Sequence, residues 1–180
     1  IKLGSKQVKY VYSGNYLVWG GSTIISYNTN NNEAAGITIY KPVNITKVYN
    51  SYDSANNYGE VRFYGGELSK VPRFLFYQCR NVTSVTLPDT IIEISDSAFE
   101  GCTSLTHIDI PDSVKEFTQS TFSDCSNLQT IKLSNNLTSI CAGCFSGCSS
   151  LESLTIPTSV EAIYYQAFSG TTSLNELVLN

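Results

Sequence analysis

Methionine is absent from this chain of 180 residues, even at position 1. We therefore expect the chain to be a processed form or a piece of a longer one, so the missing leader says nothing about its destination. Long apolar runs are absent as well. No window approaches the roughly 20 apolar residues that a membrane-spanning helix needs, and we expect no membrane span.

Positive charge is scarce in the second half of the chain. Residues 81–180 hold two Lys or Arg against eleven Asp or Glu, whereas residues 1–80 hold nine against four. A nucleic-acid partner requires a continuous basic track, which the acidic half lacks and the scattered lysines of the first half do not supply. We expect no nucleic-acid partner.

A period of 23 residues fills the acidic half without an insertion. Phenylalanine and, three positions later, a small residue recur at this spacing, followed by three apolar positions. The columns are Phe76, Phe99, Phe122, Phe145 and Phe168; Cys79, Cys102, Cys125, Cys148 and Thr171; Val82, Leu105, Leu128, Leu151 and Leu174; Val85, Ile108, Ile131, Leu154 and Leu177; and Leu87, Ile110, Leu133, Ile156 and Leu179. Such a period predicts a solenoid, in which each coil buries its apolar face against its neighbours.

One repeat, Pro111–Leu133, shows how a coil is expected to run. Pro and Asp at its start favour a turn. Val114 and Phe117 then point inward, and a short helical or 3₁₀ stretch leads to Phe122. The alternation at 129–133 predicts a strand, with Ile131 inside and its polar neighbours outside. Stacked strands would form one parallel sheet on a concave face.

Three segments follow from this pattern. Residues 59–180 are predicted to form a five-coil solenoid, and residues 35–58 a degenerate capping repeat, with Val48 in the column of Val71. Residues 1–34 are predicted to form an N-terminal β-hairpin cap, because two β-rich runs flank the loop at 13–15.

The lines PDTIIEISDSAFEGCTSLTHIDI and PDSVKEFTQSTFSDCSNLQTIKL closely resemble the BspA-like, or treponemal-type, leucine-rich-repeat family over about residues 59–180. The resemblance implies a right-handed leucine-rich-repeat solenoid, an extracellular or cell-surface location, and adhesion to host proteins or other cells, with no catalytic residues. Residues 1–21 resemble a short β-motif of phage-tail and prophage-encoded proteins.

The six cysteines invite a disulfide or zinc interpretation. Four stand in one column, where neighbouring strands bring residues about 4.8 Å apart but with parallel Cβ vectors, which suits a small buried thiol better than a bridge. Cys141 and Cys144 are additional, yet Cys144 shares the small-residue column of Ala98 and Ala167. We expect six reduced, buried thiols, with zinc or redox chemistry as the less favoured alternative, and no cofactor or metal.

The outward strand positions are the candidate ligand-binding residues. They alternate with the inward apolar columns, and Lys132 is placed to pair with Asp109 across the coils. The candidates are Ser84, Thr86, His107, Asp109, Thr130, Lys132, Ser153 and Thr155. His107, the only histidine, lacks a positioned nucleophile, because the nearest cysteine belongs to the packed column, so we expect no enzyme.

Two functions remain open. The first is a non-catalytic binding module, a bacterial surface or secreted adhesin-type repeat protein that engages a protein or glycan. The second is a structural component of a phage-tail or surface-fibre appendage. The strand at 176–179 should leave an open sheet edge, which predicts either further chain or self-association through the C-terminal coil.

Overall fold

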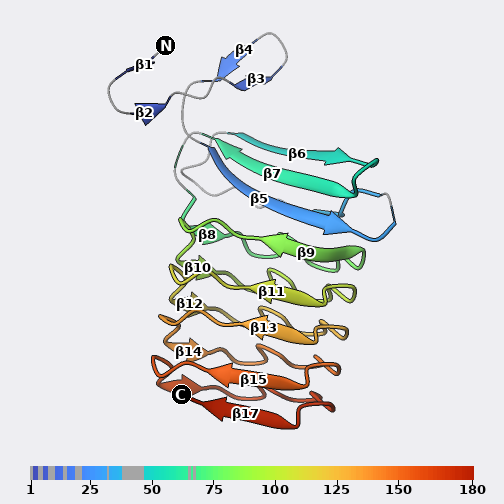
Figure 1. The fold of residues 1–180 in the computed structure, drawn as a ribbon, viewed down its shortest axis with the longest axis vertical. Helices are drawn as coiled ribbons and strands as arrows, with labels where there is room; N and C mark the ends of the chain where they lie inside the picture. The colour runs from blue at the N-terminus through green and yellow to red at the C-terminus, as the bar shows by residue number, and fades with distance from the viewer. Residues whose placement is uncertain are drawn as a thin grey trace.

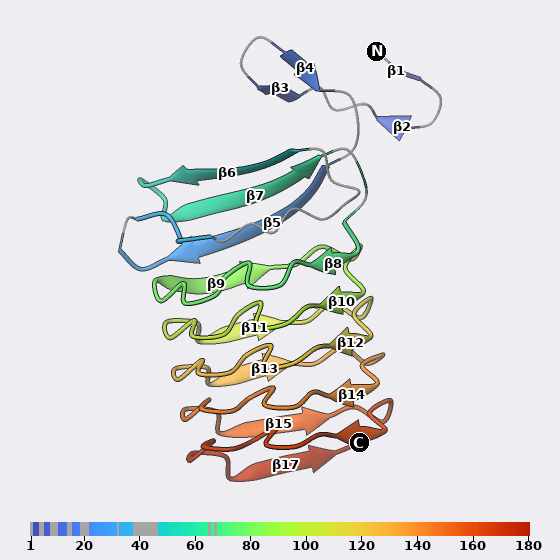
Figure 2. The same ribbon diagram turned by 180° about the vertical axis from the view of Figure 1, so that it is seen from behind.

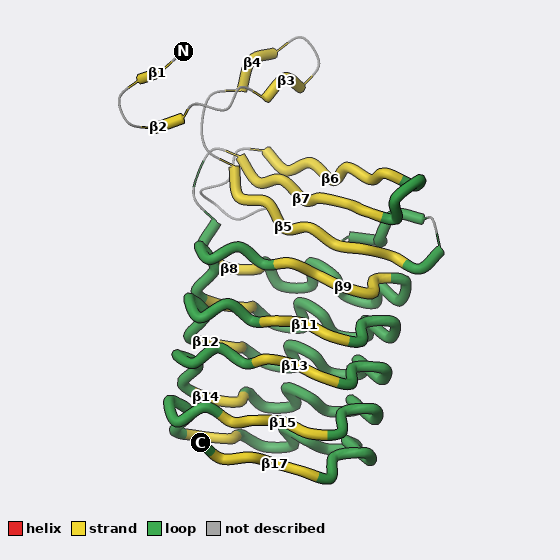
Figure 3. Tube along the Cα trace, viewed as in Figure 1, coloured by secondary structure: helices red, strands yellow, loops and turns green. Residues whose placement is uncertain are grey.

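The computed structural model describes residues 2–3, 6–7, 11–13, 16–18, 22–31, 33–37, 47–64, 66 and 68–180. Within these residues the elements are strands joined by turns, with no helix (Figure 3). Short strands at the N-terminus pair antiparallel: β1 (Lys2–Leu3) with β2 (Lys6–Gln7), and β3 (Val11–Ser13) with β4 (Tyr16–Val18). The other residues of the predicted cap before Ser22, Trp19 included, lie outside the described residues.

The repeats form the predicted solenoid, whose coils stack one below another in Figure 1. One column of strands consists of β9 (Val82–Thr86), β11 (His107–Asp109), β13 (Thr130–Lys132), β15 (Ser153–Ile156) and β17 (Glu176–Leu179). A second column of short strands consists of β8 (Lys70–Val71), β10 (Glu93–Ile94), β12 (Glu116–Phe117), β14 (Ser139–Ile140) and β16 (Ala162–Ile163). The pairing is parallel, and each residue faces the one a full repeat later, as Ile108 faces Ile131.

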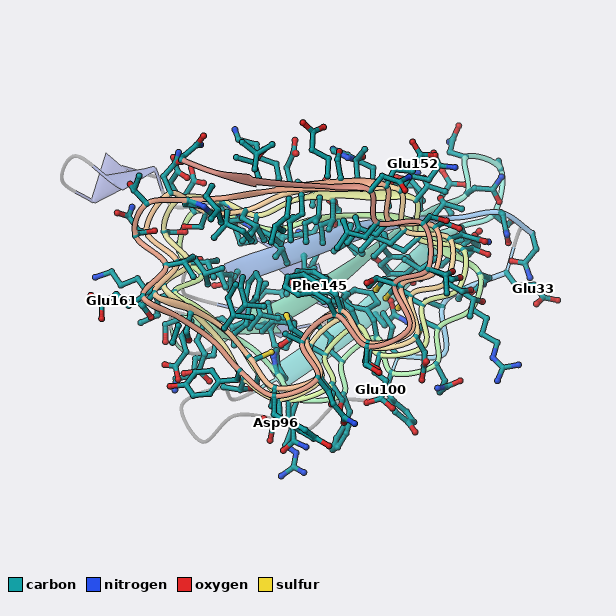
Figure 4. All side chains as sticks on the ribbon, turned by 90° about the horizontal axis from the view of Figure 1, so that it is seen from below. Glu33, Asp96, Glu100, Phe145, Glu152 and Glu161 are labelled. Atoms are coloured by element: carbon teal, nitrogen blue, oxygen red, sulfur yellow. The ribbon has the colours of Figure 1, made fainter. Side chains whose placement is uncertain are left out.

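The phenylalanine column forms the centre of the core. Rings of successive coils stack with centroid separations of 5.4, 5.1, 5.9 and 5.7 Å from Phe76 to Phe168, at interplanar angles of 12° or less. Figure 4 shows Phe145 in the middle of the coil, between the two strand columns and the turns. At the N-terminal end the edge of Phe76 meets the buried ring of Tyr27, 5.7 Å away at 71°. Tyr27 thereby covers the first ring of the stack.

The expected helical or 3₁₀ stretch before Phe122 is wrong, because turns occupy that side of every coil. Two positions per repeat have positive φ, 23 residues apart from coil to coil. They are Phe74, Ser97, Ser120, Gly143 and Gln166, and Gln78, Gly101, Asp124, Gly147 and Gly170. The amides that a helix would use internally instead donate to the next coil, as Phe122 N does to Cys144 O at 2.9 Å. Left-handed residues and bonds between coils exclude a continuous helix.

Backbone bonds beside the second strand column run in the opposite direction. There the amides donate to the preceding coil, as Thr118 N does to Ile94 O at 3.0 Å and Tyr164 N to Ile140 O at 3.0 Å. Each coil is therefore tied to both neighbours by main-chain bonds that do not depend on side-chain identity.

The described N-terminal residues contribute three longer strands to the solenoid. β5 (Ser22–Thr29), β6 (Lys47–Asp53) and β7 (Tyr58–Tyr64) join β9 in a sheet of order β6-β7-β5-β9. The described part of segment 35–58 thus differs from the expected degenerate coil: β6 is antiparallel to β7, and Val48 pairs with Phe63 rather than standing in the column of Val71. A tight turn at 54–57 brings β6 and β7 together, which favours local hairpin pairing over a full coil.

Strand directions explain why this sheet ends the repeat. β5 is antiparallel to both β7 and β9, so β7 runs parallel to the solenoid strands but is separated from β9 by β5 (Figure 2). Val61 and Phe63 in β7 are fully buried, as an additional coil would require. A strand from earlier in the chain therefore occupies the position next to the first coil.

Candidate binding face

The outward side chains of β9, β11, β13, β15 and β17 define what we call the strand face. His107, Asp109, Thr130 and Lys132 are exposed there, and Ile108 and Ile131 between them are buried. Thr86, Ser153 and Thr155 are exposed as well. Their orientation agrees with the predicted strand register, and their role in binding stays a prediction.

Ser84 differs from the other candidates because it is only half-exposed. β5 lies beside β9, pairing Asn28 with Ser84. The Ser84 hydroxyl donates to Asn28 Oδ1 at 3.1 Å. Ser84 therefore belongs to the contact between the N-terminal sheet and the first coil more than to the open face.

His107 is held by two neighbours on the strand face. Its Nδ1 lies 2.7 Å from Thr130 Oγ1 on the next coil, and its Nε2 lies 3.1 Å from Asp109 Oδ1 on its own strand. The predicted Asp109–Lys132 pair is wrong, because among the described residues the Asp109 carboxylate contacts His107 and makes no ion pair with Lys132. Two strand positions on one side place His107 and Asp109 within reach of each other.

Lys132 instead acts on Asp112 electrostatically. Asn135 donates to the Asp112 carboxylate from its backbone N at 2.9 Å and from Nδ2 at 3.3 Å. These bonds, with the charge of Lys132, hold the pKa of Asp112 below its usual range. Asp112 is consequently a carboxylate at neutral pH.

A depression of about 380 Å³ lies on this part of the face. Its lining is mixed: Leu87, Ile110 and Pro111, just beyond the ends of β9 and β11, are apolar, and the exposed residues His107, Asp109, Asp112 and Lys132 are polar or charged. The full lining is Ser84, Val85, Thr86, Leu87, His107, Ile108, Asp109, Ile110, Pro111, Asp112 and Lys132. Charged groups of both signs next to apolar lining residues suit recognition of a ligand that offers both polar and apolar groups.

The strand face continues onto the N-terminal sheet, an extension that the sequence interpretation missed. Tyr58, Glu60 and Arg62 alternate with buried residues of β7. Tyr58 donates its hydroxyl to Glu60 Oε1 at 2.7 Å, and Glu60 also pairs with Arg62. The alternation of polar and apolar residues in the sequence YGEVRFY could have predicted these outward positions.

A second depression, of about 270 Å³, lies at the β6–β7 end of this sheet. Ser51, Tyr52, Asp53, Tyr58 and Glu60 line it. Bonds from Asn56 Nδ2 and Ala55 N lower the pKa of Asp53, so this site also has a negatively charged wall.

All six cysteines are free and buried, as expected. In the column, Cys102, Cys125 and Cys148 each lie 3.1 Å from the carbonyl of the phenylalanine 26 residues earlier. Burial raises the pKa of Cys79 and of Cys148 to about 12. Over the part of the chain that the structure describes, no group of three or more His, Cys, Asp or Glu is placed to hold a metal ion.

The last coil leaves apolar side chains at the surface. Ile163, Leu177 and Leu179 are 45%, 43% and 71% exposed. The predicted self-association through this coil stays a prediction.

The model of the family described as "BspA type Leucine rich repeat region" matches residues 69–180 in six copies. The chain belongs to the BspA-type leucine-rich-repeat family. No helix of the described residues is long and apolar enough to cross a membrane. No curated protein sequence matches the chain.

Solved structures of bacterial leucine-rich-repeat proteins are similar to the chain. A protein from Bacteroides ovatus ATCC 8483 is 28% identical with a TM-score of 0.61, over 99% of this chain and 41% of that one. A leucine-rich cell surface protein from Faecalibacterium prausnitzii A2-165 is 22% identical with a TM-score of 0.56, over 78% and 40%. The chain thus spans less than half the length of these two neighbours.

Proposed function

We propose that the chain is a non-catalytic binding module of a bacterial surface or secreted protein, and that its strand face engages a protein or glycan. The observation that carries the proposal is the depression between β9 and β13, which is lined by His107, Asp109 and Lys132 together with apolar residues. Repeat proteins use such extended faces for recognition.

The surroundings of His107 argue for binding rather than catalysis. A histidine that acts on a nucleophile must lie within hydrogen-bond reach of it. His107 is committed to Thr130 and Asp109 at the surface, and the thiol of Cys102 is fully buried against the carbonyl of Phe76. These contacts favour a role for His107 as a fixed polar group of the binding face.

An extracellular or cell-surface location is part of the proposal. It is supported by the family and by the Faecalibacterium prausnitzii neighbour, whose description is a cell surface protein. The acidic coils suit a face that selects partners by charge as well as by shape.

The test is binding of the full chain to a glycan array and to a panel of immobilised serum and extracellular-matrix proteins. For each probe bound, Asp109→Lys and Lys132→Glu should each weaken binding at least tenfold, because each reverses a charge that lines the depression. Glu161→Lys is the matched control, since Glu161 is exposed on another side of the coil (Figure 4). Binding of no probe, or equal binding by the reversed variants, contradicts the proposal.

A further inference from the structure

Cys141 and Cys144 form a pair that stands apart from the cysteine column. They are the first and fourth residues of a β-turn closed by a bond from Cys144 N to Cys141 O at 3.2 Å, with Gly143 at φ +63°. The ends of such a turn lie within 7 Å at Cα, a range that overlaps the 4.4–6.8 Å of disulfides. The two side chains lie close enough for each to shift the pKa of the other.

The surroundings differ between the two sulfurs. Cys141 is 5% exposed at the turn and lies 3.8 Å from Thr121 Oγ1, whereas Cys144 is fully buried. The contact with Cys144 lowers the pKa of Cys141, and burial raises the pKa of Cys144. Cys141 is therefore the less deeply buried and more acidic member of the pair.

The repeat itself shows that neither sulfur is needed for packing. In the column of Cys144, Thr121 stands one repeat earlier, Ala98 two repeats earlier and Ala167 one repeat later. Ser95 stands two repeats before Cys141. Cys102, Cys125 and Cys148 of the column have a different role, since each bonds to a backbone carbonyl of the preceding coil.

We propose that Cys141 and Cys144 are a redox pair that closes to an intramolecular disulfide in the presence of a small-molecule disulfide. The Cys141 thiolate attacks one sulfur of the external disulfide and releases one thiol. The Cys144 sulfur then loses its proton, attacks the Cys141 sulfur and releases the second thiol. One external disulfide is reduced to two thiols, and the two cysteines are oxidised to one disulfide.

The pairing is specific to these two residues. Column cysteines on adjacent coils have parallel Cβ vectors, which keep Cβ atoms farther apart than the ~3.8 Å of a disulfide. Their burial and raised pKa also disfavour the thiolate that the first attack on the external disulfide requires, whereas the pKa of Cys141 is lowered.

The experiment treats the folded chain with excess hydroxyethyl disulfide, then denatures it and counts free thiols by maleimide labelling and whole-protein mass. The wild type should retain four of its six thiols and carry no mercaptoethanol adduct. Cys141→Ser and Cys144→Ala, residues that the chain already uses in those columns, should lose no thiol pair. Cys148→Thr is the matched control, because Thr171 occupies that column, and it should still lose two.

Three results would overturn the proposal. The wild type could retain six thiols while folded by circular dichroism. The Cys141→Ser variant could still lose two, which would indicate a Cys144–Cys148 bridge. The Cys148→Thr variant could lose none, which would place Cys148 in the bridge. The wild-type count does not depend on whether a variant folds.

Discussion

The ring of Tyr27 lies across Gly59, its partner on the neighbouring strand, and occupies the space where a side chain would begin. A Cβ on Gly59 would be 2.2 Å from Tyr27 Cζ. The ring is held there from three sides: it stacks on Tyr52, meets the edge of Phe76 and donates its hydroxyl to Asn50 Oδ1 at 2.9 Å. Glycine at this position therefore lets Tyr27 cover the core.

Gly59→Ala should destabilise the fold, because the fixed ring cannot move away from the new methyl group. Overpacking of this kind costs about 1–3 kcal/mol. Gly36→Ala is the control, since no atom lies within 4 Å of its Cβ position, and it should be neutral or stabilise by up to about 1 kcal/mol. Urea unfolding of both variants measures the difference.

The cause can be checked in a double variant. If the clash with Tyr27 is responsible, Gly59→Ala should cost almost nothing in a Tyr27→Ala background. An equal cost in both backgrounds would contradict the contact.

Phe122→Ala should cost about 3–5 kcal/mol, since Phe122 is fully buried and stacked on both sides. Phe168, half-exposed and stacked on Phe145, is the comparison, and Phe168→Ala should lose less than half as much. Chemical denaturation provides both values. A loss below about 1 kcal/mol for Phe122→Ala would mean that the ring stack does not hold the coils together.

Ser120→Gly should stabilise the protein. Ser120 has φ +55°, a conformation that costs a residue with a Cβ about 1–2 kcal/mol, against the roughly 0.5–1 kcal/mol of extra chain entropy that glycine loses on folding. The net gain should be up to about 1 kcal/mol. Ser123→Gly, on the same turn without positive φ, should destabilise; thermal melts of both distinguish local strain from a general effect of glycine.

The Asp112 carboxyl should titrate below its usual range in the folded protein. A carboxyl with a depressed folded pKa adds stability above its unfolded pKa, and that stability is lost as the pH falls through the folded pKa. Carbon-detected NMR titration gives the folded pKa directly. Asn135→Ala removes the Nδ2 donor but keeps the backbone donor, so the pKa of Asp112 should rise part of the way toward its usual value. An unchanged pKa would mean that the Asn135 side chain does not cause the lowered value.

The solenoid was predictable because each coil repeats the same local chemistry. The alternation around Ile131 determines which side chains face out, and the 23-residue spacing determines which residue stands beside which. The sequence alone therefore places His107, Asp109 and Lys132 on one face. Sequence could not decide among contacts available to flexible side chains, so the partner of Asp109 was wrong.

The strand order of the N-terminal sheet was less predictable because β5 pairs with strands that come much later in the chain, although β6 and β7 form a local hairpin. β5 inserts between β7 and β9, and no periodicity records that strand order. The turns before Phe122 were misjudged for a related reason: short apolar runs are compatible with a helix until the bonds between coils are known. In both cases distant backbone partners determined the outcome.

The opposed main-chain bonds between coils have an electrostatic consequence. Amides on the turn side point along the stack toward the C-terminal coil, and those beside the second strand column point the other way. Their dipoles oppose each other, whereas those of an α-helix add up to about half a charge at each end. The stack therefore lacks a helix-like polarity, and an approaching partner experiences the field of the ionised side chains, which are predominantly acidic along these coils.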